Sequence, residues 1–288
     1  MFPVLFSIGN IAVSSFGIFL VLGFLYGLFL IWRLTRAWDL NEEKILDITL
    51  LTFVGGLIGA RLYFVIVNLQ YFAASPMNII LINKAPGFSF WGGFLGGWLT
   101  LFFFARRKRF DFWQLADIAF VGFLGGLIFS EIGCFLGGCN IGITSKAFFA
   151  VTQVGFVGKR LPIQLLEGLL LTLSLMKIWA QATHFHQRGK IAGLGLIMVG
   201  IIQLILEPFK QNHSAVIFPV LFVILGVVIL YRIKKQNPVV HLKAILASSI
   251  RFFVDSKARK GVVQNIVKSC YNQKITIGWK LKNLRRNH

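Results

Sequence analysis

Residues 88–132 read FSFWGGFLGGWLTLFFFARRKRFDFWQLADIAFVGFLGGLIFSEI. Two apolar blocks, 88–105 and 113–132, flank a run of four basic residues at 106–109. A helix needs about 20 mostly apolar residues to cross the hydrocarbon core of a bilayer. This stretch therefore predicts two membrane-spanning helices joined by a short basic connection.

The rest of the chain has the same character. Its 288 residues are 56% hydrophobic and 14% charged, whereas soluble domains are about 45–50% apolar and about 25% charged. This excess excludes an ordinary soluble domain and predicts an all-α integral membrane protein, because helices satisfy their own backbone in lipid. The expected spans are 12–32, 46–67, 88–105, 113–132, 161–182, 191–209 and 215–231.

The connections between these spans alternate in basic charge. One set, which includes the C-terminal segment, carries 23 Lys and Arg residues and the other carries five. The five are Lys84, Lys146, Lys159, Arg160 and Lys210. Cytosolic connections carry the excess of Lys and Arg. About seven spans, with the N-terminus outside and the C-terminus in the cytosol, agree with this asymmetry.

Two parts follow from the distribution of charge: a transmembrane domain at 1–231 and a basic cytosolic tail at 232–288. The tail holds fourteen Lys and Arg residues and a single acid, Asp255. Either anionic lipid or RNA attracts such a segment. Because the tail adjoins a membrane domain, we expect it to bind anionic inner-leaflet lipids rather than nucleic acid. Apolar residues at helical spacing over 242–253 predict a short interfacial helix there.

Glycines recur at four-residue spacing in several spans. The pairs are Gly55 and Gly59, Gly92 and Gly96, Gly93 and Gly97, and Gly122 and Gly126. Small residues at this spacing let helix backbones approach closely in lipid. We expect a compact bundle.

Five ionisable residues fall in or beside the spans: Arg61, Asp117, Glu131, Glu167 and Glu207. Such residues usually face a partner or a polar cavity, and function is the first hypothesis for them. The three glutamates and Arg61 predict a cavity that opens to the outside, with an ion pair between Arg61 and Glu207. Asp117 lies near the basic run at 106–109, and a structural role is favoured for it.

The cysteines are Cys134, Cys139 and Cys270, and their spacing predicts neither a disulfide framework nor a metal site. Cys134 and Cys139 fit a redox couple or a nucleophile, but a small buried hydrophobe is the favoured interpretation. We expect no metal and no cofactor.

Several motifs, in order over roughly residues 3–231, resemble a known family. They are the Gly59-Ala-Arg-Leu62 element, the Phe88–Gly97 segment, the basic run at 106–109, Leu161-Pro-Ile-Gln-Leu-Leu-Glu167 and Gly200-Ile-Ile-Gln-Leu-Ile-Leu-Glu-Pro-Phe-Lys210. Their order and spacing are similar to those of prolipoprotein diacylglyceryl transferase, a multi-pass enzyme of the bacterial plasma membrane.

The resemblance implies a bundle of the diacylglyceryl transferase type. It also implies transfer of a diacylglyceryl group from phosphatidylglycerol to the lipobox cysteine thiol of a preprolipoprotein. The partners would be a phosphatidylglycerol-like phospholipid and the preprolipoprotein signal segment. Candidates for the lipid cavity are then Arg61, Gln164, Glu167 and Glu207.

The departures from the family pattern fall where its chemistry is expected. The family positions are occupied here by Trp91, Glu131, Cys134, Cys139 and Gln203. Trp91 cannot accept a proton, Glu131 repels a phosphate, and Gln203 carries no charge. Two functions therefore remain open: a modified lipid transfer to a thiol, or a non-catalytic paralogue that binds lipid or a lipoprotein segment. A small transporter is less favoured, because no inverted repeat is visible.

Overall fold

The computed structural model describes residues 4–8, 11–79, 81, 85, 87–153, 156–211 and 216–234. These residues belong to one compact unit, Met1–Lys234. Most of the expected basic tail, from residue 235 onward, lies outside the described residues. The same holds for the short helix expected over 242–253 and for the tail's contact with anionic lipid.

Within the described residues, each of the expected spans coincides with a helix. These helices are α1 (Ser15–Ala37), α2 (Glu42–Val67), α4 (Phe90–Arg107), α5 (Phe112–Gly137), α6 (Ile163–Ala182), α7 (Lys190–Leu206) and α8 (Ile217–Lys234). Five of the described helical segments are long and apolar enough to cross a membrane: α1, α2, α5, α6 and Lys190–Phe209. Ile217–Ile233 is a shorter apolar helix. The expectation of a helical, multi-pass membrane protein is thus confirmed.

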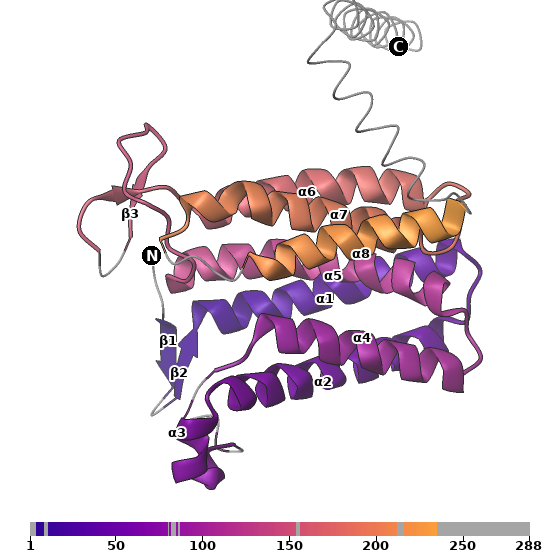
Figure 1. Cartoon of the computed structure of the whole chain (residues 1–288), viewed down its shortest axis with the longest axis horizontal. Helices are drawn as coiled ribbons and strands as arrows, with labels where there is room; N and C mark the ends of the chain where they lie inside the picture. The colour runs from indigo at the N-terminus through magenta and orange to yellow at the C-terminus, as the bar shows by residue number, and fades with distance from the viewer. Residues whose placement is uncertain are drawn as a thin grey trace, which may run out of the picture. The chain divides into compact units, whose positions relative to one another are not determined.

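The described residues are mostly helical, and short strands accompany the helices. Strands β1 (Val4–Ile8) and β2 (Ile11–Ser14) form one antiparallel pair, and β3 (Val151–Thr152) and β4 (Lys159–Arg160) form another. Two small elements, α3 (Leu69–Ala74) and the 3₁₀ turn η1 (Pro76–Ile79), follow α2. All of these lie at the left-hand end of the helices in Figure 1. The connections α1–α2, α4–α5 and α6–α7 lie at the opposite end.

The glycines at four-residue spacing are helix contacts, as expected. A Cβ added at Gly59 of α2 would lie 2.5 Å from the carbonyl oxygen of Gly92 in α4. One added at Gly27 of α1 would lie 2.8 Å from the carbonyl oxygen of Gly122 in α5. Such distances are too short for a side chain, so only glycine permits these backbone contacts.

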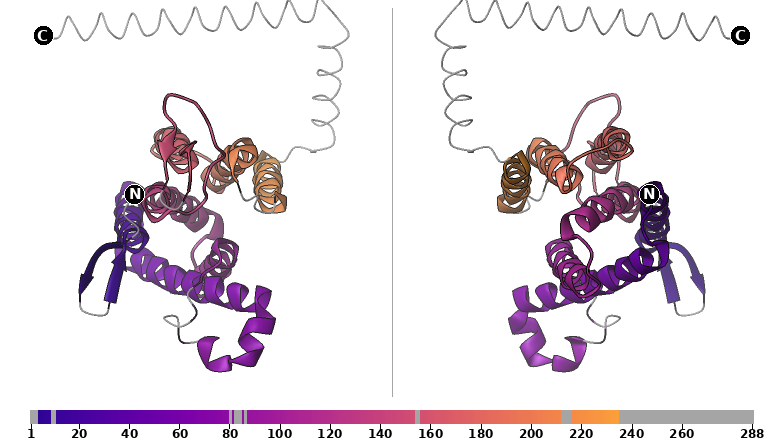
Figure 2. Two further views of the ribbon diagram at one scale, coloured as in Figure 1. Left: turned by 90° about the vertical axis from the view of Figure 1, so that its left-hand side faces the viewer. Right: turned by 90° about the vertical axis from the view of Figure 1, so that its right-hand side faces the viewer.

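Seen end-on, the bundle has three groups of helices (Figure 2). Helices α6, α7 and α8 form one group, α1 and α5 the next, and α2 and α4 the last. Helix α5 packs against α1, α4, α6 and α7 and is therefore the centre of the bundle. Its buried residues lie mainly between Leu115 and Gly125, and Gly133 and Cys134 are buried near its C-terminal end.

Helix α5 owes its limits to local signals in the sequence. Asp111 precedes it, and its Oδ1 accepts the backbone N–H groups of Trp113 (2.9 Å) and Gln114 (3.3 Å). Gly138 follows it with φ at 80°, a left-handed conformation that glycine adopts without strain, and donates its N–H to the Cys134 carbonyl. The turn at Gly138 redirects the chain toward α6 and so places Cys139 at the end of the bundle.

Candidate functional site

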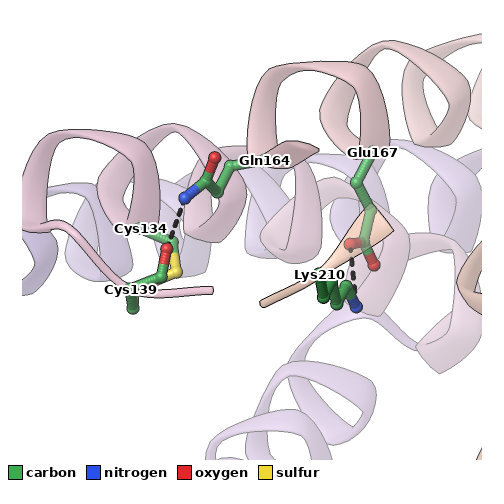
Figure 3. The surroundings of a disulfide bond; sticks show 5 residues. All are labelled: Cys134, Cys139, Gln164, Glu167 and Lys210. Atoms are coloured by element: carbon green, nitrogen blue, oxygen red, sulfur yellow. Dashed lines mark hydrogen bonds and ion pairs between the residues drawn. A yellow bond between two sulfur atoms is a disulfide. The ribbon is translucent and has the colours of Figure 1, made fainter. Parts of the chain in front are cut away.

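Glu167, Glu207 and Lys210 form a buried ionic group at the end of the bundle that carries the hairpins. The Lys210 Nζ lies 3.5 Å from Oε2 of Glu167 and 3.5 Å from Oε2 of Glu207. All three residues are less than one tenth exposed. Glu167 lies in the second turn of α6, whereas Glu207 begins the 3₁₀ turn η2 (Glu207–Phe209). One ammonium group therefore joins two carboxylates from different elements. Figure 3 shows its contact with Glu167.

Glu131 brings a third carboxylate from α5. Its Cβ lies 3.6 Å from the position that a Cβ on Gly168 of α6 would occupy. Its Oε2 is buried and has no hydrogen-bond partner among the described residues. Gln203 of α7 hydrogen-bonds Glu167 through its side chain, while its own Oε1 is likewise unpartnered there. The group thus contains three carboxylates and one ammonium group, and Glu131 Oε2 and Gln203 Oε1 both lack a hydrogen-bond partner among the described residues.

The structure joins Cys134 and Cys139 in a disulfide bond, which corrects the expectation of no disulfide. The two Cα atoms are 5.0 Å apart, because the turn at Gly138 folds the chain back over the last turn of α5. The Gln164 side-chain amide donates a hydrogen bond to the Cys139 carbonyl oxygen. Disulfide and amide together hold the segment after α5 against the start of α6 (Figure 3). Spacing alone does not show this pairing, since it depends on the sharp turn between the two cysteines.

Arg61 does not pair with Glu207, and this expectation was wrong. Its guanidinium group donates to four backbone carbonyl oxygens, those of Asn78 (2.7 Å), Ala85 (2.8 Å), Ile79 (3.0 Å) and Gly87 (3.0 Å). These carbonyls belong to the connection between α2 and α4. Arg61 therefore organises this connection, because its five donors satisfy carbonyls that have left helical geometry.

Trp91 makes aromatic contacts. Its ring stacks on Phe218 of α8, with centroids 4.3 Å apart and planes 14° apart, and it meets Phe222 edge-on at 5.2 Å. The residue at the family's histidine position is thus part of an aromatic contact between α4 and α8. Of the candidates from the sequence, Glu131, Gln164, Glu167, Gln203, Glu207 and the two cysteines gather at one end of α5, α6 and α7. Arg61 and Trp91 make separate contacts.

Asp117 has the structural role that the sequence favoured, although with a different partner. Its two carboxylate oxygens accept the backbone N–H groups of Gly189 and Ala192, each at 2.7 Å. Gly189 is the N-cap residue of α7, and Ala192 lies in its first turn. His186 lies 3.6 Å away from the same carboxylate. Asp117 thus caps α7 rather than neutralising the basic run at 106–109.

Two residues of the site were not among the candidates from the sequence. Lys210 is the cation of the ionic group, and the i,i+3 spacing from Glu207 was the available signal. Arg160 is 8% exposed, and its Nη1 donates to Gln211 Oε1 (2.8 Å) and to the Gly142 carbonyl (3.1 Å). Both belong to the five basic residues outside the basic connections. A Lys or Arg residue in the set of connections that carries few basic residues was therefore a second available signal for a site residue.

The residues of this site are better suited to accept a proton than to bind an anion. Lys210 is shared between two carboxylates, so little of its charge is left for a further anion. Glu131 Oε2 has no donor among the described residues, and a carboxylate oxygen in this state can accept a proton from a substrate. The fold and the site together define a multi-pass membrane protein with a buried acid–base group at one end of its helices.

Comparison with known proteins identifies its family. The family model for prolipoprotein diacylglyceryl transferase matches residues 3–232, and the chain belongs to this family. The similar proteins are each called phosphatidylglycerol–prolipoprotein diacylglyceryl transferase. The protein from Rickettsia rickettsii (strain Sheila Smith) is 30% identical over 217 residues, which are 73% of this chain and 83% of that relative. The one from Idiomarina loihiensis is 29% identical over 255 residues, 82% and 94% of the two chains.

A third relative, from Deinococcus radiodurans, is 35% identical over 144 residues, which are 49% of this chain. This match spans 42% of that relative. The resemblance drawn from the motifs at 59–62, 88–97, 161–167 and 200–210 is thus confirmed at the level of the family.

Proposed function

We propose that this protein transfers a diacylglyceryl group from a phosphatidylglycerol-like phospholipid to the thiol of a lipobox cysteine, in the bacterial plasma membrane. Family membership supports the reaction class. One observation carries the proposal for this chain: Glu131, which interacts electrostatically with Glu167 and Lys210, has a buried carboxylate oxygen with no donor among the described residues. A thiol is a weak nucleophile until its proton is removed, and a positioned carboxylate is one group that removes it.

In this mechanism the thiol proton passes to Glu131 Oε2. The thiolate then attacks the glyceryl carbon that carries the phosphate ester, the S–C bond forms, and the C–O bond to the phosphate breaks. Glycerol phosphate leaves with the bonding electrons. Glu167 and Glu207 hold Lys210 in place, and Gln203 and Gln164 orient the surrounding segments. In this chain Glu131 replaces the base that Trp91 cannot supply.

Seven spans, with the N-terminus outside and the C-terminus inside, belong to the same proposal. The helices run between the same two ends, and the basic connections share one end (Figure 1). The site then opens toward the outside, where lipobox cysteines are presented. A reporter inserted between Gln70 and Met77 should report an external position, and one after His288 a cytosolic position. We also propose the division into 1–231 and a tail at 232–288, with salt-sensitive binding of the isolated tail to anionic vesicles as its test.

A transfer assay tests the proposed reaction. Purified full-length protein is incubated with radiolabelled phosphatidylglycerol and a lipobox peptide. We expect the peptide cysteine to be labelled, and Glu131→Gln to lower the rate about 100-fold or more, since general-base catalysis contributes about 10²–10⁴-fold. Glu43→Gln changes an exposed glutamate of α2 in the same way and should leave the rate unchanged.

The rival function is a non-catalytic paralogue that binds lipid or a lipoprotein segment. The packing of Trp91 between α4 and α8 favours it, because the family's histidine position then has no part in a site. An unlabelled peptide, together with saturable lipid binding that Glu207→Ala abolishes, would establish binding and refute transfer.

A further inference from the structure

The hairpin β3–β4 carries buried polar groups that the proposed acid–base chemistry does not use. Gln153 is 3% exposed, and neither its amide nitrogen nor its amide oxygen has a hydrogen-bond partner among the described residues. Arg160 is 8% exposed, and its Nε is unpartnered in the same part of the chain. Buried polar groups are normally hydrogen-bonded, so a bound ligand is one explanation for these three unpartnered atoms.

The register of the hairpin places both side chains on one face. Val151 pairs with Arg160, and Thr152 pairs with Lys159. Side chains alternate along a strand, and Gln153 directly follows β3, so continued alternation places it on the same face as Val151 and Arg160. The burial pattern agrees, because Thr152 and Lys159 are exposed whereas Gln153 and Arg160 are buried. One face of the hairpin thus presents a guanidinium group and an amide toward the protein.

Arg160 is held in a fixed orientation. Its Nη1 is bound by Gln211 and by the Gly142 carbonyl, and its guanidinium carbon lies 4.6 Å from the ring centroid of Phe156. None of the ion pairs among the described residues uses Arg160. The nearby acids Glu167 and Glu207 both pair with Lys210 instead. The positive charge of Arg160 is therefore available. Its partner Gln211 directly follows Lys210 of the ionic group in the sequence. A preorganised guanidinium group with a free N–H is suited to an oxyanion.

We propose that Arg160 and Gln153 bind the phosphate ester of a phospholipid headgroup. The Arg160 Nε–H and the Gln153 side-chain N–H₂ donate to phosphate oxygens, and the cation offsets the negative charge that remains on the departing glycerol phosphate. This inference rests on the proposed function in taking a phospholipid as the ligand. It supplies the positive charge that Lys210, shared by two carboxylates, cannot provide.

Binding is measured on the full chain in neutral detergent, as the shift of the melting temperature with increasing ligand. Three ligands are compared: short-chain phosphatidylglycerol, the matching diacylglycerol without a phosphate, and inorganic phosphate. We expect saturable stabilisation by phosphatidylglycerol and at most a small effect of diacylglycerol. Arg160→Gln should weaken phosphatidylglycerol binding at least tenfold, and Arg160→Lys should recover only part of it, because the planar fork is lost.

Gln153→Leu separates binding from folding. Without ligand this variant should melt at the same temperature as the wild type or higher, because it removes two buried polar atoms that have no partner in the part of the chain that the structure describes. Its response to phosphatidylglycerol should nevertheless be at least tenfold weaker. Lys159→Gln is the matched control, since it removes a positive charge from the exposed face of the same strand, and it should bind as the wild type does.

Unchanged phosphatidylglycerol affinity in both Arg160→Gln and Gln153→Leu would overturn the proposal, and so would equal stabilisation by diacylglycerol. Inorganic phosphate that binds as tightly as the lipid would overturn the assignment to a lipid headgroup. The transfer assay distinguishes this site from the proposed reaction. If lipid binding depends on Arg160 but no transfer occurs, the proposed phosphate site is supported and the proposed reaction is refuted. If transfer occurs and Arg160→Gln does not affect it, the proposed reaction is supported and the proposed phosphate site is refuted.

Discussion

The two ends of α7 each hold a buried carboxylate group, but the two groups differ in how far their polar atoms are satisfied. At the N-terminal end, each oxygen of Asp117 accepts a backbone N–H group at 2.7 Å. At the C-terminal end, Lys210 joins Glu167 and Glu207, while Glu131 Oε2 has no donor within the described residues. A buried charge is therefore not by itself a sign of function. The free oxygen distinguishes a site from a helix cap.

Removal of the cation should give the largest effect. Lys210→Met leaves Glu167 and Glu207 buried without a positive charge, and loss of one partner of a buried ion pair costs about 3–5 kcal/mol. Unfolding of the detergent-solubilised protein by denaturant measures this loss. Lys210→Arg keeps the charge and should lie much closer to the wild type. Unchanged stability of Lys210→Met would show that the two carboxylates do not depend on this ammonium group.

Removal of the cap should destabilise less. Asp117→Ala takes away the acceptor of two N–H groups at the start of α7, and a hydrogen bond to a charged group contributes about 1.5–3 kcal/mol. We expect a loss of about 2 kcal/mol in the same unfolding measurement, with the transfer rate per folded molecule unchanged. Asp47→Ala, at an exposed position of α2, is the control. A lower transfer rate per folded molecule in Asp117→Ala would contradict the purely structural role of Asp117.

The smallest effect should be a pH dependence at the capped end. The contact with Asp117 raises the pKa of His186 above its ordinary value of about 6.5, against the opposing effect of burial. A pKa raised by folding means that the protonated form stabilises the protein. This contribution is fully present below the unfolded pKa and is lost as the pH rises through the folded pKa.

The wild type should therefore gain a little stability between about pH 8 and about pH 6, relative to His186→Gln. Melting temperatures of both proteins over this range measure the difference. Parallel curves would show that His186 is not protonated preferentially in the folded state.

Sequence reasoning was reliable for residues whose role depends on their own surroundings along the chain. The spans follow from hydropathy alone, and Gly59 and Gly92 lie in patterns that already indicate close packing. It failed where the partner is distant in sequence. Arg61 was assigned to Glu207, but it binds the carbonyls of Asn78 and other residues after α2. Arg61 lies 146 residues from Glu207 in the sequence, and no local pattern shows whether two such residues meet.

The sequence by itself determined that this chain is a helical, multi-pass membrane protein of the diacylglyceryl transferase family, because burial in lipid imposes apolar length and charge asymmetry on every span. Only the tertiary structure decided which polar residues meet. It brought Glu131, Glu167 and Lys210 together, joined Cys134 to Cys139, and left Trp91 in an aromatic contact. The physical reason is that an ionic group or a site depends on positions to within about an ångström, and the packing of α5, α6 and α7 sets those positions.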